Sequence, residues 1–424
     1  KQPNTNELSC NSQKNMQIAT SEQQAFGALP SSRSSTTSCA AGSFLPTLEQ
    51  QTQTPTKKWS GETLRLSVRI LPPFYPLSPT YATIGNSLEV IGANLEECFR
   101  TASLYCRYGS SGIWLQTPER VEIQINLWKR RDDDDVVLAE LSCLAGDVIV
   151  FHRYARCILN AASGDFSQTR HLAKGRAGLT GIFQEPTSSS VTMTQATQAL
   201  EITSTMLSNP HSQLMGMEML SILTDVSKSS LQTCQMTSRM VLFGECHTCT
   251  AMKQPEIANT VQKWVQAKMG AGEDSSVVRH MDNDSDAEDD DLLEGRGNRE
   301  WNAMKHFALT IFTNALEVLQ HDHALQGWTD AALSRSNGNS IFCHLVEEEM
   351  TQTLNRPHDA CLAIRSLSIT STCSDTLKRQ LSQSWILKDI FNALDVGRNC
   401  HENLEFECMK LLDALGASTV FEQT

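Results

Sequence analysis

Cys246-His247-Thr248-Cys249 is the pattern in this sequence with the clearest potential for metal or redox chemistry. Two cysteines at this spacing supply two of the four ligands of a tetrahedral zinc ion, or form a redox-active dithiol. A zinc site would need two further ligands, and Cys234, His306 and the Cys400-His401 pair lack the spacing of a zinc ribbon or finger. A redox pair is typical of a strand–helix setting, whereas the neighbouring segments predict helices. The pattern therefore favours structural cysteines, with zinc binding and redox chemistry as the alternatives.

Two other clusters contain residue types that bind metal ions. His321-Asp322-His323 predicts a polar turn between two helices, and Glu347-Glu348-Glu349 predicts one solvated face of a helix. Gly-rich phosphate loops, nucleophile elbows, His-Glu-x-x-His motifs and EF-hand spacings do not occur in the sequence. We therefore expect no catalytic residue, no metal ion and no cofactor, and predict that the protein is not an enzyme.

An acidic stretch carries the one candidate modification site. Residues 273–294 contain ten acidic residues and one arginine, which account for about −9 of the net charge of −13. Such a block repels itself and stays solvated, so it predicts a disordered loop over 273–296. Ser285 is followed at its third position by Glu288, the preference of acidophilic kinases of the casein kinase 2 type. Ser285 is therefore a candidate phosphosite.

Composition limits the class of protein. The 424 residues suffice for two to four domains, and the negative charge argues against a general nucleic-acid binder. Apolar runs of about 18 residues do not occur, so no membrane span is predicted. The 14 cysteines are too sparse for a disulfide scaffold. We expect an intracellular protein, cytoplasmic or nuclear, with reduced thiols.

The elements that would position these residues fall into two folded regions. Residues 1–60 are rich in Ser, Thr, Gln and Asn, and predict a mostly disordered segment with a short helix over 16–29. An α+β domain is expected over 61–145. A helix and a linker follow over 146–190, and apolar stripes at helical spacing continue over 191–424.

Within the α+β domain, two kinds of periodicity alternate. Apolar residues at every second position over 64–70 predict a half-buried strand, and a spacing of three or four predicts an amphipathic helix over 87–106. The apolar residues over 121–127 alternate as in a strand but also fit a helix in part. The period of the apolar residues alone does not decide between strand and helix over 121–127.

The segment from Leu64 to Pro79 resembles the RWD and ubiquitin-conjugating-enzyme superfamily. There a strand of alternating residues runs into a Tyr-Pro-x-x-Pro turn, which Tyr75, Pro76 and Pro79 match here. A further strand and a helix follow in the same order. The resemblance implies an antiparallel sheet with helices, in which these three residues are structural turn residues.

The catalytic branch of that superfamily needs a nucleophilic cysteine after a His-Pro-Asn motif, and residues 70–130 contain no such motif. Cys98 lies on the apolar stripe of the predicted helix, where a thiol is buried and inert. The resemblance therefore implies the RWD branch, whose domains dock proteins. The alternative is a ubiquitin-conjugating-type enzyme, with Cys98 or Cys106 as the nucleophile, or a cofactor of the ubiquitin pathway.

A rival fold for the same region is an immunoglobulin-like IPT/TIG β-sandwich, which residues 85–95 and 104–109 resemble. The two folds differ over residues 93–103, which form a helix in the first and a loop in the second. The apolar spacing favours the helix.

The helical region suggests repeats. Residues 199–225, 307–328 and 360–393 share an apolar helix, a polar break and a second apolar helix, as in armadillo- or HEAT-like repeats. An irregular bundle is the alternative. In the second of these segments, Phe307, Ile311 and Leu319 are expected to face the core and Glu317 the solvent.

These expectations together predict a non-enzymatic protein–protein interaction adaptor. An RWD-like domain would dock proteins, and a helical solenoid would hold a partner in an extended groove. We expect protein partners, and neither nucleic acid nor membrane. A further hypothesis is a nuclear-transport or chromatin adaptor whose acidic loop binds basic partners or imitates an anionic ligand.

Overall fold

The computed structural model describes residues 68–109, 112–129, 136–169, 193–244, 255–268, 290–334 and 340–417, which belong to one compact unit over 54–424. Several predicted features lie outside the described residues: the helix over 16–29, the first part of the strand over 64–70, Cys246, Cys249 and Ser285. Helix α9 begins at Asp290, so the predicted loop over 273–296 extended too far. Acidic residues are favourable in the first turn of a helix, and a charge run therefore does not mark where a helix begins.

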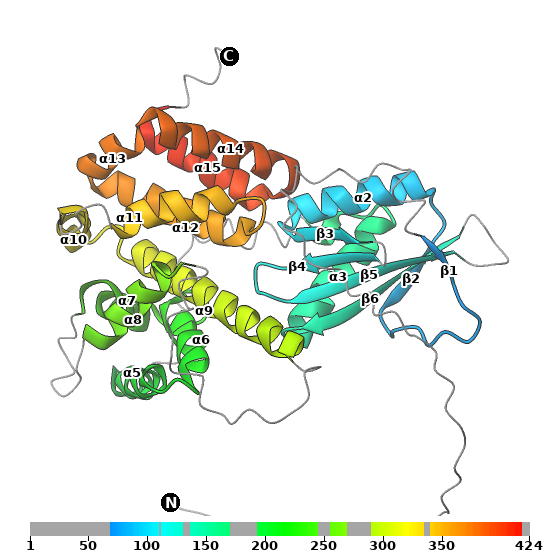
Figure 1. The fold of residues 1–424 in the computed structure, drawn as a ribbon, viewed down its shortest axis with the longest axis horizontal. Coiled ribbons are helices and arrows are strands. Elements are labelled where there is room, and N and C mark those ends of the chain that lie inside the picture. The colour runs from blue at the N-terminus through cyan, green and yellow to red at the C-terminus, as the bar shows by residue number, and fades with distance from the viewer. Residues whose placement is uncertain are drawn as a thin grey trace, which may run out of the picture. The chain divides into compact units, whose positions relative to one another are not determined.

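The N-terminal half contains a mostly antiparallel sheet (Figure 1). Its strands are β1 (Arg69–Ile70), β2 (Tyr81–Ile84), β3 (Tyr105–Gly109), β4 (Gly112–Gln116), β5 (Glu122–Lys129) and β6 (Val137–Ala145). The order is β2-β6-β5-β4-β3, and β1 pairs in parallel with β5. The described strands form this one sheet, as an α+β domain requires, rather than the two facing sheets of a β-sandwich.

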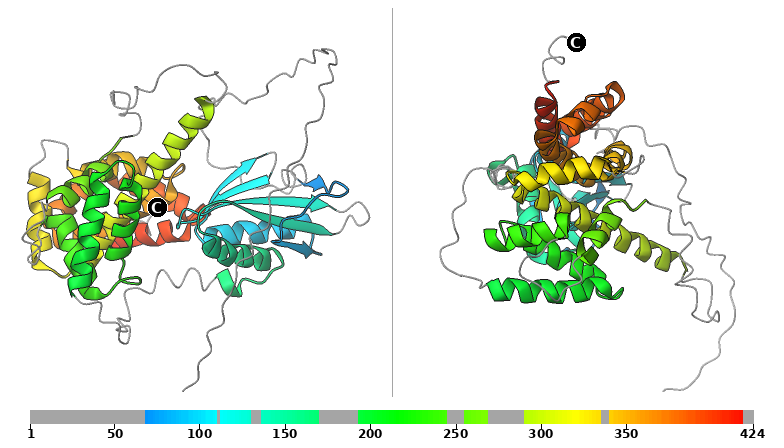
Figure 2. Two further views of the ribbon diagram at one scale, coloured as in Figure 1. Left: turned by 90° about the horizontal axis from the view of Figure 1, so that it is seen from below. Right: turned by 90° about the vertical axis from the view of Figure 1, so that its left-hand side faces the viewer.

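The alternation of apolar residues along the strands decides which face of the sheet packs against helices. Ile123, Ile125 and Leu127 of β5 are buried against the helices α2 (Leu88–Thr101) and α3 (Val148–Ala162). Both helices lie on the same side of the sheet (Figure 2). The segment over 121–127, which the period left open, is thus mainly strand, and most of residues 93–103 are helix.

Two boundaries differ from the prediction. Helix α2 ends at Thr101, because Ser103 takes a left-handed φ of 54° and Tyr105 opens β3, so the helix predicted over 87–106 was too long. Helix α3 shares its core with the sheet, although the sequence placed it in a separate segment over 146–190. A helical period shows which side of α3 is apolar, but not which neighbour covers it.

The C-terminal half is helical in its described parts. Its α-helices are α5 (Met193–Ser208), α6 (Gln213–Thr224), α7 (Leu231–Phe243), α8 (Pro255–Val265), α9 (Asp290–Val318), α10 (His323–Ser334), α11 (Ile341–His344), α12 (Pro357–Cys373), α13 (Asp375–Leu381), α14 (Ser384–Cys400) and α15 (Glu402–Leu415). A π-helical turn (Leu345–Glu349) and a 3₁₀ turn (Met350–Gln352) follow α11. Helix α9 packs against α6, α7, α8 and α12 (Figure 1). Within the described ranges, no helix is both long and apolar enough to cross a membrane.

The phase predicted for α9 is correct on its apolar side and wrong at one acidic residue. Ile311 and Leu319 are buried, and Phe307 packs partly buried against the same core. Glu317 does not face open solvent, because its carboxylate accepts from the Arg365 guanidinium of α12 at 2.6 Å. The carboxylate lies between two helices, a partnership that the sequence of α9 alone does not contain.

At least three polar contacts between described residues join the two halves. His358 Nε2 lies 3.1 Å from the Gln116 carbonyl oxygen, and the Asn403 amide donates to Ser103 Oγ at 2.9 Å. The third contact is an ion pair of Arg100 with Glu405 at 3.8 Å. Sheet and helices therefore belong to one folded unit.

Candidate functional site

The two cysteines considered as nucleophiles lie in environments that suppress the thiolate. Cys98 is fully buried in α2, where burial raises the pKa of its thiol to about 12. Burial also raises the pKa of Cys106 well above its ordinary value, and its Sγ donates to the Leu104 carbonyl at 3.3 Å. Because the thiolate is the nucleophilic form, this setting does not favour thioester chemistry at either residue.

The residues considered as metal ligands are dispersed. Among the described residues, no group of three or more His, Cys, Asp or Glu side chains is placed to hold an ion. His306 Nδ1 lies 2.7 Å from Asp359 Oδ1, whereas His401 Nδ1 accepts the Leu404 amide at the start of α15. Cys234 is buried in α7.

Residues of the His321-Asp322-His323 and Glu347-Glu348-Glu349 clusters make contacts within and between helices. Asp322 accepts the Ala324 amide at the beginning of α10 and pairs with Arg239 of α7. Glu348 pairs with Lys268 at 2.6 Å. The expectation of a solvated Glu347-Glu348-Glu349 face is wrong for Glu349, which is buried, because the π-helical turn rotates it away from solvent.

The predicted turn residues hold a strap across the sheet. The Tyr75 ring packs against Trp128 with centroids 4.8 Å apart, and its hydroxyl donates to Glu140 Oε2 at 3.3 Å. Tyr75 is only half-buried, and Pro76 and Pro79 are exposed in the same segment. These residues position a loop, and they present no group for chemistry.

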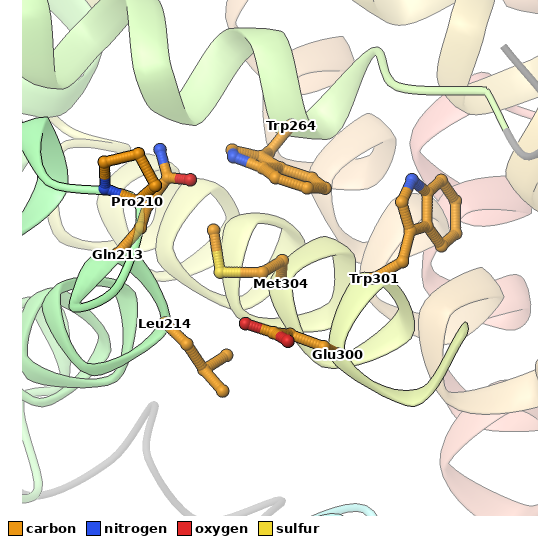
Figure 3. Close-up of a pocket in the computed structure, with 7 residues that line it drawn as sticks. All are labelled: Pro210, Gln213, Leu214, Trp264, Glu300, Trp301 and Met304. Atoms are coloured by element: carbon orange, nitrogen blue, oxygen red, sulfur yellow. The ribbon is translucent and has the colours of Figure 1, made fainter. Parts of the chain in front are cut away.

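The helical half contains a groove lined by aromatic and aliphatic side chains (Figure 3). Its volume is about 230 Å³, which suits one or two side chains rather than a drug-sized ligand. The lining residues are Pro210, Gln213, Leu214, Trp264, Glu300, Trp301 and Met304. In Figure 3 Trp264 lies across from Leu214 and Glu300, with Met304 between them. A larger hollow of about 530 Å³ is lined by Asp375, Lys378, Arg379 and Ser382 of α13 and its end, which are polar residues of one short helix.

A buried lysine fixes the walls of this groove relative to each other. Lys305 of α9 follows Met304 directly, and its Nζ donates to the Val265 and Ala267 carbonyls at 2.7 and 2.8 Å. The Val265 carbonyl is at the end of α8 and the Ala267 carbonyl lies two residues beyond it, where helical carbonyls lack partners and attract a positive charge. Lys305 therefore ties the helix that carries Trp264 to the helix that carries Trp301.

The charge of Lys305 is balanced within the core. Its Nζ lies 2.8 Å from Glu349 Oε1 and 3.0 Å from His344 Nε2. Burial, followed by the nearby Lys305 charge, lowers the pKa of His344 to about 4. His344 is thus neutral near pH 7, and its Nε2 accepts a hydrogen bond from the Lys305 ammonium group.

The rim of the groove combines one carboxylate with aromatic surface. Glu300 is exposed, and both tryptophans are half-buried. The Arg356 guanidinium lies 5.2 Å from the centre of the Trp301 ring and holds it from outside the groove lining. The arrangement suits an apolar side chain inside the groove and a basic group beside Glu300.

Sequence reasoning did not identify this groove. The sequence-based predictions name none of Trp264, Trp301 and Met304. A signal did exist, since two tryptophans at half-buried helix positions are typical of binding surfaces. Their proximity depends on the packing of α8 against α9, which the sequence does not encode locally.

The chain has no significant match among protein-family models, curated proteins or solved structures. The site must therefore be interpreted from its own geometry.

Proposed function

We propose that this protein is a non-enzymatic interaction adaptor that holds a segment of a partner protein in the groove of Figure 3. The observation that carries the proposal is the pairing of Trp264 with Met304 and Leu214 in a half-open apolar groove. Tryptophan surfaces of this kind dominate the binding energy of protein interfaces. In this proposal the sheet domain is an RWD-like docking module and the helical half is an armadillo-like scaffold.

The groove also defines the chemistry of the partner segment. A leucine, methionine or aromatic side chain of the partner would fill the space over Met304, and a lysine or arginine beside it would pair with Glu300. A groove of this volume holds an anchor of one or two residues, so the remaining affinity would come from surrounding contacts. The partner is therefore expected to bind through a short apolar and basic motif.

A photo-crosslinking amino acid in place of the groove residue Gln213 tests this proposal in the full-length chain. The crosslinked peptide should contain an apolar anchor next to a basic residue. With the purified partner, Trp264→Ala should weaken binding at least tenfold and Glu300→Lys several-fold. Trp385→Ala is the matched control, because Trp385 is an exposed tryptophan of α14 outside the groove. Unchanged affinity in Trp264→Ala, or equal losses in both tryptophan variants, would contradict the proposal.

The ubiquitin-conjugating alternative has its own test. Incubation with ubiquitin, an activating enzyme and ATP should give no thiol-sensitive adduct, because Cys98 is buried, Cys106 is half-buried and both thiols have raised pKa values. A reducible adduct that disappears in Cys98→Ser or Cys106→Ser would replace the adaptor proposal with an enzyme.

A further inference from the structure

The strap covers only part of the side of the sheet opposite α2 and α3. The strap over 71–80 covers the half formed by β5, β6 and β2, where Glu140 accepts from the Ser78 amide at 2.6 Å and from Trp128 Nε1 at 2.9 Å. On β3 and β4 the alternating residues Tyr105, Arg107 and Trp114 point to the same side, because Ile113 and Leu115 face the helices. Exposure varies over this second half: Tyr105 is buried, Trp114 is half-buried and Arg107 is exposed.

Arg107 is held in one orientation on this second half. Its guanidinium carbon lies 5.3 Å from the centre of the Tyr105 ring and 5.4 Å from that of Trp114. The two rings pack edge to face at 5.9 Å, and Arg107 Nε donates to the Tyr105 hydroxyl at 3.0 Å. Stacking on the two rings and the hydrogen bond to Tyr105 hold the Arg107 side chain in one conformation. It therefore loses less conformational entropy on binding a ligand than a mobile arginine would.

No described residue accepts a hydrogen bond from the two outer amino groups of Arg107. Arg107 is exposed, and among the described residues no carboxylate forms an ion pair with it. Its cross-strand neighbour Trp114 is followed in the same row by Gln124, whose amide donates to Asn126 at 3.2 Å. The neighbours in the row of Arg107 are thus a ring and an amide, whereas the Glu122 carboxylate lies in the adjacent row, that of Tyr105 and Gln116, and forms no ion pair with Arg107.

We propose that Arg107, with Tyr105 and Trp114, forms an anion-recognition site that binds the carboxylate side chains of an acidic peptide. A planar guanidinium with two free amino groups binds a carboxylate through two parallel hydrogen bonds. Charge complementarity selects the occupant, because the site presents a positive charge that no described carboxylate neutralises. Tyrosine, tryptophan and arginine are also the residue types that most often dominate the binding energy of an interface.

The site specifies one partner chemistry for the docking role proposed for the sheet domain, and rests on that role. It is separate from the groove of Figure 3, whose rim carries a carboxylate and favours a basic partner. Trp264→Ala should therefore leave binding of an acidic peptide unchanged, so that failure of one site is distinguishable from failure of the other.

The test uses the full-length chain and an acetylated hexaglutamate peptide as the probe. NMR of the arginine Nε–H and tryptophan Nε1–H groups should show the peptide shifting the Arg107 and Trp114 signals. Arg107→Gln should weaken binding at least fivefold. Arg107→Lys keeps the charge but loses the fork and the bond to Tyr105, so it should weaken binding nearly as much.

Arg156→Gln is the matched control, because Arg156 is an exposed arginine of α3 on the opposite side of the sheet. It removes the same charge and should leave the affinity unchanged, and unchanged circular dichroism would show that each variant is folded. Wild-type affinity in Arg107→Gln or in Arg107→Lys would overturn the proposal. So would an equal loss in Arg156→Gln, which would indicate attraction by general charge.

Discussion

Replacing Lys305 with methionine tests whether one buried charge holds the groove together. The Lys305 side chain is 1% exposed and its partner Glu349 is 4% exposed, so the substitution leaves a buried carboxylate without its cation. Removal of one partner from a buried ion pair typically costs about 3–5 kcal/mol. The Val265 and Ala267 carbonyls also lose a donor, although the end of α8 can partly satisfy them with water. We expect a destabilisation of about 3–5 kcal/mol, in the upper part of the range for single substitutions.

Denaturant unfolding followed by tryptophan fluorescence and circular dichroism measures this loss. The double variant Lys305→Met/Glu349→Leu should recover at least about 2 kcal/mol, because an apolar pair of similar size removes the unpaired charge. Lys268→Met is the control, since Lys268 pairs with Glu348 at an exposed position and such pairs contribute little. A loss below about 1 kcal/mol in Lys305→Met, or a double variant as unstable as the single one, would refute the argument that the buried pair matters.

Four further substitutions test the packing. The pKa of His344 is lowered from 6.5 to about 4 in the folded state, which therefore binds fewer protons than the unfolded chain. The free energy of unfolding should fall as the pH drops from 6.5 towards 4. His344→Gln should reduce the difference in unfolding free energy between pH 7 and pH 5 by about 2 kcal/mol. Gly397→Ala should cost about 2–4 kcal/mol of stability, because its added Cβ would lie 2.5 Å from the Glu405 backbone nitrogen. Gly327→Ala in α10 is the control, since its Cβ meets nothing within 4 Å and should stabilise the fold by about 0.5–1 kcal/mol. Equal melting temperatures of the two variants would contradict the close packing of α14 against α15. Tyr75→Phe removes one of three donors to the buried Glu140 and should cost about 1–2 kcal/mol by denaturant unfolding, and an unchanged midpoint would show that the strap does not depend on this bond.

Local pattern predicted the elements that bury one regular face. The alternation of β5 and the three-to-four spacing of α2 each appear directly in the structure, because side-chain period follows from backbone geometry. Pro210 separates α5 from α6, because a proline cannot continue the preceding helix. Element ends were less predictable, as Tyr105 shows: it continues the apolar stripe of α2 but lies in β3.

The sequence pattern did not predict which element packs against a given helix or strand face. Glu317 and Glu349 have the sequence neighbours of solvated residues, yet one pairs with Arg365 of α12 and the other with Lys305 of α9. A charge becomes buried only where another element supplies the opposite charge, and that depends on contacts distant in the chain. The resemblance to RWD domains and to armadillo repeats remains a proposal, supported by one sheet with two helices and by the helical C-terminal half.

The sequence by itself determined that this chain has an α+β region followed by helices, and that Cys98 lies on the covered side of its helix. Only the tertiary structure placed Trp264 of α8 beside Met304 and Trp301 of α9, across an intervening stretch of chain. The physical reason is that helical period is a local property, whereas this groove depends on Lys305 binding the carbonyls at the end of another helix. The orientation of Arg107 has the same origin, since Trp114 reaches it through the pairing of β3 with β4.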